Sequence, residues 1–200
     1  MSKIYFKIRR QDAPDSSPYW EEFQVAAKKG MTVAGALREI QLNPMNAKKE
    51  ATAAVVWGDE CGETCSSCAM VINGRGRLAC ETFLDDLAQP VTLRPLSKFR
   101  VLRDLRVDKT IELFSLCTGC GLCLEACPRF GERFDYIGPA AIVAAHGKAR
   151  LEMLMGKGGI EECGHAEQCQ NACPEEIPIL TILGQASREV TRFVAKKFLG

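Results

Sequence analysis

Apolar and polar residues alternate at the start of the chain, which is the pattern of a half-buried strand. Ile4, Phe6 and Ile8 occur at every second position, and this period of two places them on one face of a sheet. Residues 12–18 are rich in proline, serine and aspartate, which indicates a turn. Residues 23–27 can then return beside the first strand, so the pattern predicts a β-hairpin.

A helix is expected after the hairpin. Thr32 is a suitable N-cap for a helix over residues 33–42, and Asn43 followed by Pro44 ends it. The rest of the first half predicts shorter elements. These are buried strands over 53–57, 69–72 and 91–93, a turn over 73–76 and a short helix over 81–87.

The second half of the chain has the pattern of a helical protein. Apolar residues recur at helical spacing over residues 139–155, a glycine-rich stretch ends that run, and a final helix is expected over 178–198. The change from mixed to helical patterning divides the chain. We therefore predict one domain over residues 1–106 and a second over residues 107–200.

Composition narrows the class of protein. Eleven cysteines occur among 200 residues, and the net charge is +1. A near-neutral chain lacks the basic excess of nucleic-acid binders, so we expect no nucleic-acid partner. The N-terminus shows no basic-then-apolar signal segment, so we expect a reducing compartment and metal ligation rather than disulfides. No apolar run approaches the roughly 18 residues needed to span a bilayer, so any membrane role is expected to be peripheral.

The most specific motif lies at residues 117–128, where the spacing is C-x2-C-x2-C-x3-C-P. This is the run of bacterial ferredoxins, in which the fourth cysteine binds the other of two clusters. Residues 163–174 repeat the run with one cysteine replaced by Ala166. Zinc motifs normally space two pairs of ligands apart, so the spacing disfavours zinc here.

The two runs together supply four thiolates to one cluster and three to the other. The set of four, expected to hold a [4Fe–4S] cluster, is Cys117, Cys120, Cys123 and Cys173. The set of three, expected to hold a [3Fe–4S] cluster, is Cys127, Cys163 and Cys169. An iron without a thiolate is easily lost, which favours three irons. A [4Fe–4S] cluster with water or another fourth ligand is the alternative.

A further cysteine group lies in the first half of the chain. Its members are Cys61, Cys65, Cys68 and Cys80. Plant-type [2Fe–2S] sites use C-x4-C-x2-C and a distant fourth cysteine, whereas here the first gap holds three residues. We predict a [2Fe–2S] cluster, with a structural zinc or a vestigial site as the alternative. If Cys61 does not reach the cluster, Asp59 or Glu60 could supply an oxygen ligand.

These features predict a fold class and a kind of function. The fold class is α+β, with an N-terminal β-grasp domain of the plant-ferredoxin kind and a C-terminal all-α, bacterial-ferredoxin-like dicluster domain. Three clusters without a nucleotide motif or a Ser/His/Asp arrangement indicate a conductor of electrons. No residue of the chain is predicted to be catalytic.

The chain resembles the iron–sulfur subunits of succinate dehydrogenase and fumarate reductase. The resemblance covers nearly the whole chain and is carried by residues 68–74 (CAMVING), 89–93 (QPVTL), 101–108 (VLRDLRVD), 138–140 (GPA) and the two Cys-Pro pairs. Residues 39–44 (EIQLNP) resemble the bacterial branch that uses menaquinone and a diheme membrane anchor.

The resemblance implies a place in a larger complex. It implies a flavoprotein partner that oxidises succinate at FAD, and electron transfer through [2Fe–2S], [4Fe–4S] and [3Fe–4S] clusters. It also implies a quinone at a cytochrome b-type membrane anchor, and the resemblance to the bacterial branch implies that this quinone is menaquinone. It also implies a location on the cytoplasmic face of the bacterial inner membrane. The same three cysteine sets are implied as ligands. A relay subunit of a heterodisulfide-reductase-like or thiol-linked fumarate reductase, or a zinc-stapled scaffold, is the alternative function.

The chain departs from the family pattern at several positions. The gap between the first two cysteines is one residue shorter, and a segment that relatives carry between residues 108 and 117 is missing. Some relatives place a histidine directly after the first cysteine of the third group, near quinone. Here that position is Gly164, and His165 follows. His165 could bond a quinone, although a solvent-facing loop histidine is the more ordinary interpretation.

Overall fold

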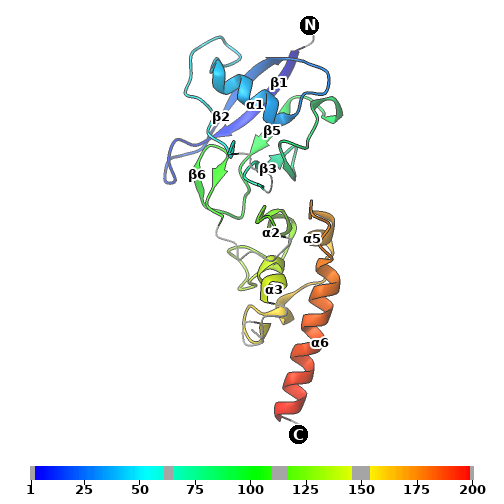
Figure 1. Cartoon of the computed structure of the whole chain (residues 1–200). Coiled ribbons are helices and arrows are strands. Elements are labelled where there is room, and N and C mark those ends of the chain that lie inside the picture. The colour runs from blue at the N-terminus through cyan, green and yellow to red at the C-terminus, as the bar shows by residue number, and fades with distance from the viewer. Residues whose placement is uncertain (1–2, 61–64, 110–116, 146–153, 199–200) are drawn as a thin grey trace. The chain divides into compact units, whose positions relative to one another are not determined.

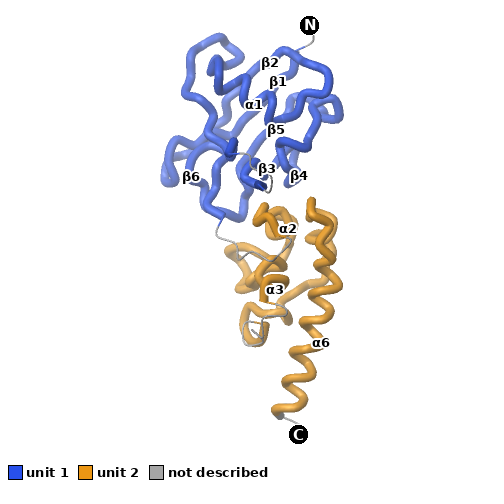
Figure 2. The backbone as a smooth tube through the Cα atoms, viewed as in Figure 1, with its two compact units in different colours: residues 1–109 blue, residues 110–200 orange. Residues whose placement is uncertain are grey.

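The chain folds into two compact units, residues 1–109 and residues 110–200 (Figure 2). A computed structural model describes residues 3–60, 65–109, 117–145 and 154–198. The first unit is built on sheets and the second on helices (Figure 1). This confirms the predicted change from a sheet-containing half to a helical half.

A five-stranded mixed sheet forms the centre of the N-terminal unit, in the order β2-β1-β5-β3-β4. Strand β1 (Lys3–Arg10) pairs antiparallel with β2 (Tyr19–Ala26) and parallel with β5 (Val91–Arg94). Strand β3 (Ala69–Ile72) pairs antiparallel with both β5 and β4 (Arg75–Leu78). The sheet thus joins the first hairpin to the hairpin that follows the first cysteine loop.

The first hairpin forms as its pattern predicts. Ile4, Phe6 and Ile8 are buried while the residues between them are more exposed, which is the signature of a strand with one face on the core. Phe6 lies opposite Phe23 in the register, so the two aromatic side chains share the buried face. The second strand begins at Tyr19, earlier than the predicted residue 23.

Helix α1 (Val33–Leu42) has the predicted bounds. The hydroxyl of Thr32 accepts a hydrogen bond from the backbone nitrogen of Gly35 at 3.2 Å, which satisfies one donor of the first turn. Asn43 ends the helix. The apolar face of α1 is buried, and the helix lies over the sheet (Figure 1).

The predicted strand over residues 53–57 is wrong, because these residues form no ladder. Val55 and Trp57 are buried as expected, but side chains bond the backbone of the segment. The Arg10 guanidinium donates to the carbonyl oxygen of Ala53 at 3.0 Å, and the nitrogen of Val56 donates to Asp104 at 2.9 Å. These bonds replace those that a neighbouring strand would supply.

Other short elements also differ from the prediction. The expected helix over 81–87 is only a single 3-10 turn, η1 (Leu84–Asp86). The expected turn over 73–76 needs only Asn73 and Gly74, which both have positive φ (46° and 81°) and suit a two-residue hairpin. A further hairpin, β6 (Val101–Arg103) with β7 (Arg106–Val107), follows the sheet. Its strands are too short for a pattern to reveal.

A buried ion pair ties these segments together. Arg10 Nε donates to Asp104 Oδ1 at 2.9 Å, and both side chains are fully buried. The same guanidinium donates to Glu21 at 2.5 Å. Burial alone would lower the pKa of Arg10, but its hydrogen bond to Asp104 and the charges of Asp104 and Glu21 raise it. The arginine therefore stays charged and links β1, β2, the 53–57 segment and the β6–β7 turn.

The C-terminal unit packs short helices against one long helix. The short elements are α2 (Leu122–Ala126), α3 (Pro139–Ala145), η2 (Ile160–Glu162) and α5 (Gln168–Asn171). The long helix α6 (Ile179–Phe198) confirms the helix predicted over 178–198. The predicted run over 139–155 begins with α3, and its residues 146–153 lie outside the described residues. Within the described part of the chain, no helix has the length and apolar character to cross a membrane.

Replacing Arg10 by leucine is expected to destabilise the N-terminal unit. The substitution leaves the buried carboxylate of Asp104 without its counterion, so the free energy of unfolding should fall by about 3–5 kcal/mol. Both tryptophans, Trp20 and Trp57, lie in this unit, so tryptophan fluorescence during urea unfolding reports it selectively.

The matched control is Lys28→Met, which removes the ion pair between exposed Lys28 and Glu39. That change should cost less than about 1 kcal/mol. Equal losses for the two variants would show that the buried pair does not hold the unit together.

Candidate iron–sulfur sites

The hairpin formed by β3 and β4 brings two cysteines of the first group together. Cys68 directly precedes β3 and Cys80 follows shortly after β4, so the antiparallel pairing places them side by side. Their sulfur atoms lie 3.4 Å apart. Cys65 is half-buried, with its sulfur 3.6 Å from the hydroxyl oxygen of Ser67. Cys61 lies outside the described residues.

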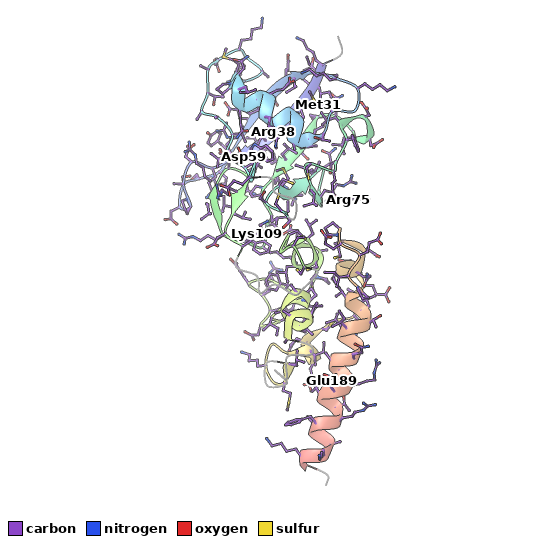
Figure 3. The ribbon with its side chains drawn as sticks, viewed as in Figure 1. Met31, Arg38, Asp59, Arg75, Lys109 and Glu189 are labelled. Atoms are coloured by element: carbon purple, nitrogen blue, oxygen red, sulfur yellow. The ribbon has the colours of Figure 1, made fainter. Side chains whose placement is uncertain are left out.

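The loop that carries Cys65 and Cys68 rests on the segment before it. A Cβ atom added at Gly58 would lie 2.1 Å from the carbonyl oxygen of Ser67, so only glycine allows this approach. The Ser67 hydroxyl donates to the Gly58 carbonyl at 3.2 Å. Lys109, which is labelled in Figure 3, donates to the carbonyl of Ser66 at 2.8 Å. These contacts hold the loop from both sides.

The two carboxylates considered as substitute ligands already have partners. Asp59, which is labelled in Figure 3, accepts a hydrogen bond from Gln41 at 3.4 Å. Glu60 pairs with Arg106 at 3.4 Å, and both side chains are exposed. Each of these contacts is long and weak, so neither fixes a carboxylate in place.

A cavity in the C-terminal unit is lined by the predicted set of four cysteines. These are Cys117, Cys120, Cys123 and Cys173. Gly119 and Gly121 both have positive φ (68° and 80°), which lets the chain turn back between successive cysteines. The Gly119 nitrogen donates to the Cys117 sulfur at 3.4 Å. Ala140, Val143 and Ile179 supply apolar walls.

A second cavity of this unit is lined by the predicted set of three cysteines. These are Cys127, Cys163 and Cys169. Ala166, which occupies the position of the missing fourth cysteine, lines the same cavity. His165 also lines it and is exposed, with a φ of 49°. The structure therefore gathers the same two sets that the spacing predicts, with the missing ligand on the wall of the three-cysteine cavity.

Burial and crowding make two of these thiols, Cys123 and Cys169, reluctant to ionise by themselves. Burial raises the pKa of the Cys123 thiol, and the charges of Cys120 and Cys117 raise it further. Burial likewise raises the pKa of Cys169, with a further increase from Cys127. Iron ions bound by the thiolates would compensate this repulsion. The sulfur donors, the apolar walls and the grouping therefore fit iron–sulfur clusters.

Among the described residues, no three Cys, His, Asp or Glu side chains converge as they would on a single metal ion. The cysteines are instead distributed along the walls of the two cavities.

Two residues of the three-cysteine cavity were missed by sequence reasoning. Arg129 donates to Glu162 Oε2 at 2.9 Å and lies over the ring of Phe134, 4.4 Å from its centroid. Tyr136 is buried, and its hydroxyl has no hydrogen-bond partner among the described residues. The position of Arg129 after the first Cys-Pro pair was a usable signal. No sequence pattern marks the tyrosine hydroxyl as unpaired.

Comparison with known proteins adds the family. A 2Fe-2S iron-sulfur cluster binding domain matches residues 5–113, and a 4Fe-4S dicluster domain matches residues 116–178. The chain is 34% identical to the succinate dehydrogenase iron-sulfur subunit of Bacillus subtilis, over 98% of this chain and 96% of the relative. It is 30% identical to the fumarate reductase iron-sulfur subunit of Haemophilus influenzae, over 62% of this chain and 70% of the relative.

A solved structure shows the same fold. This chain aligns with a chain of the Mycobacterium smegmatis Sdh1 complex in the apo form with a TM-score of 0.72 and 21% identity, covering 99% of this chain and 98% of that one. The alignment with the Bacillus subtilis relative extends over 243 positions, more than the 200 residues of this chain. The relative therefore carries segments that this chain lacks.

The two domains define an iron–sulfur protein that transfers electrons. The chain belongs to the family of iron–sulfur subunits of succinate dehydrogenase and fumarate reductase. This confirms the family inferred from the sequence motifs, and with it a role as the electron-transfer subunit of a succinate:quinone oxidoreductase. The matches do not favour the alternatives of a thiol-linked relay or a zinc-stapled scaffold.

Replacing Gly58 by alanine is expected to displace the first cysteine loop. The new Cβ would meet the backbone of Ser67 at 2.1 Å and 2.4 Å, so the loop must move and the [2Fe–2S] site should lose iron. The free energy of unfolding should fall by about 1–3 kcal/mol. Iron content and the EPR signal of the reduced [2Fe–2S] centre measure the loss.

Gly35→Ala in α1 is the matched control, because its nearest atoms lie at an ordinary 3.5 Å and 3.6 Å. That variant should keep its iron and gain up to about 1 kcal/mol from helix propensity. A full [2Fe–2S] signal in Gly58→Ala would contradict the proposed contact.

Proposed function

We propose that the three cysteine groups hold three different clusters. The [2Fe–2S] ligands are Cys61, Cys65, Cys68 and Cys80, of which Cys61 is assigned from spacing and family resemblance alone. The [4Fe–4S] ligands are Cys117, Cys120, Cys123 and Cys173. The [3Fe–4S] ligands are Cys127, Cys163 and Cys169. The observation that carries the proposal is the separation of the C-terminal cysteines into cavities lined by four and by three.

The folds that hold these groups are proposed to be those of two ferredoxin types. Support for a β-grasp domain over residues 1–106 comes from the mixed sheet, in which β1 is parallel to β5, and from the helix α1 packed beside it. Support for a ferredoxin-like dicluster domain over residues 107–200 comes from the short helices α2 and α5 beside the cysteine runs.

The residues around the cysteines prepare the sites for electron transfer. When bound, the clusters pass single electrons between the FAD of a flavoprotein subunit and a quinone at a membrane anchor. Apolar side chains around the four-cysteine cavity limit the access of water. The Gly119 amide, which donates to the Cys117 sulfur, stabilises negative charge on that ligand and so favours the reduced state.

The remaining partners follow from the family. We propose a flavoprotein subunit, a cytochrome b-type anchor subunit and menaquinone as partners, and a location at the cytoplasmic face of a bacterial inner membrane. Support comes from the names of the relatives and from residues 39–44, which resemble the menaquinone-linked branch.

Iron analysis tests the proposal most directly. Anaerobically reconstituted full-length protein should contain about nine iron atoms per chain, the sum for the three cluster types. Oxidised protein should show the EPR signal of a [3Fe–4S] cluster, and reduced protein should show that of a [2Fe–2S] cluster. Iron near zero, with zinc in its place, would overturn the assignment.

Ala166→Cys is expected to convert the three-cysteine site. The substitution adds a fourth thiolate to the wall of that cavity, so the oxidised [3Fe–4S] signal should disappear and the chain should gain about one iron atom. Ala166→Ser adds a similar volume with a poorer ligand for iron, and it should keep the signal. Retention of the signal and iron content in Ala166→Cys would show that residue 166 does not face the missing corner.

A further inference from the structure

Tyr136 is a buried polar residue that the relay described so far does not use. Its side chain is 3% exposed and belongs to the hydrophobic core of the C-terminal unit. Its hydroxyl is buried and makes no hydrogen bond among the described residues. Buried hydroxyls in folded proteins nearly always have a hydrogen-bond partner. An unpaired one therefore indicates that its acceptor forms only when another group is bound nearby.

The position of Tyr136 indicates which group this is. The side chain lines the cavity that contains Cys127, Cys163 and Cys169. Burial raises the pKa of the Tyr136 hydroxyl, and of these three cysteines Cys163 raises it most. A neutral thiol is a weak acceptor of hydrogen bonds, whereas a thiolate carries negative charge and accepts a charge-assisted one. A cluster-bound thiolate of Cys163 would therefore give the buried hydroxyl the acceptor that it lacks.

The backbone around Tyr136 keeps its ring in place. The nitrogen of Ile137 donates to the carbonyl oxygen of Gly158 at 2.9 Å. Gly158 lies so close to Asp135 that an added Cβ would be 2.3 Å from the Asp135 carbonyl oxygen. On the other side, a Cβ at Gly138 would lie 2.4 Å from Leu124. Close contacts on both sides of Tyr136 therefore hold its backbone. The burial of its side chain leaves the ring little room to turn away.

We propose that Tyr136 donates a hydrogen bond to the sulfur of Cys163 when the three-cysteine site is filled, and thereby raises the reduction potential at that site. The inference rests on the proposed function, because it requires a cluster bound by Cys163. A hydrogen bond to a ligand sulfur stabilises the more negative, reduced state. The phenol keeps its proton in both oxidation states, so no bond forms or breaks.

The effect is confined to one of the two C-terminal sites. Among the residues that the structure describes, those that line the four-cysteine cavity include no tyrosine. A hydrogen bond from Tyr136 therefore favours reduction at the three-cysteine site over the four-cysteine site. In the proposed electron path, this difference draws electrons toward the quinone end of the chain.

Tyr136→Phe is the direct test, because it removes the hydroxyl and keeps the ring in the core. The full chain, reconstituted anaerobically, is titrated electrochemically while EPR follows the [3Fe–4S] signal. The ratio of oxidised to reduced cluster at a fixed ambient potential should rise about threefold to tenfold, where tenfold corresponds to about 59 mV for one electron. The [2Fe–2S] and [4Fe–4S] potentials should not change, and they serve as internal controls.

Tyr19→Phe is a matched control in the other unit. It removes a hydroxyl of the N-terminal unit that donates a hydrogen bond to Asp12 Oδ1 at 3.3 Å. All three potentials should stay at their unmodified values in this variant. If Tyr136 had only a structural role, its replacement would change the stability and not the [3Fe–4S] reduction potential. An unchanged potential in Tyr136→Phe would therefore overturn the inference.

A second variant keeps the test decisive if Tyr136→Phe does not assemble. The chain has three tyrosines, so a Tyr5→Phe, Tyr19→Phe background carries tyrosine only at position 136. Incorporation of 3-fluorotyrosine there makes the phenol a stronger donor, and the [3Fe–4S] potential should rise relative to the unfluorinated background. No rise would overturn the inference. Absence of any [3Fe–4S] signal in the unsubstituted protein would instead overturn the proposed function itself.

Discussion

Repulsion among closely placed thiolates is the constraint on which the C-terminal unit depends. Cys127 and Cys169 belong to its hydrophobic core, and four further cysteines with partly buried side chains pack against that core. Helices α2 and α5 have five and four residues, far fewer than the roughly 12–15 that an isolated helix needs in water. We therefore expect the unit to gain much of its order from the clusters proposed above, because bound iron would offset the repulsion and hold the short helices in place.

The N-terminal unit is stabilised in a different way. Its sheet, its helix α1 and the buried Arg10–Asp104 pair form a scaffold from protein groups alone. Because Asp104 also accepts the nitrogen of Val56, the scaffold extends to the segment that precedes the first cysteine loop. For the described part of the first cysteine loop, residues 65–68, we expect a dependence on the proposed cluster. The two units thus differ in how far metal binding is coupled to folding.

Sequence reasoning succeeded where the determining interactions are local. Thr32 and Asn43 mark both ends of α1, and the cysteine spacing alone divides the C-terminal thiols into the two sets that line separate cavities. It failed at residues 53–57, because the groups that bond their backbone come from Arg10 and Asp104, more than 40 positions away. The orphaned hydroxyl of Tyr136 was invisible for the same reason, since burial depends on the whole unit.

The crossed arrangement of the two C-terminal cysteine runs has a consequence for assembly. Cys123 lies in helix α2 and lines the four-cysteine cavity. Cys127, the residue directly after α2, lines the three-cysteine cavity. Four residues of helix rise only about 6 Å along the axis. The short peptide between Cys123 and Cys127 therefore limits the distance that an electron must cross between the two proposed centres. Each run also gives its last cysteine to the other centre. The two centres are therefore interlocked: neither can be completed, repaired or moved apart without the peptide that builds its neighbour.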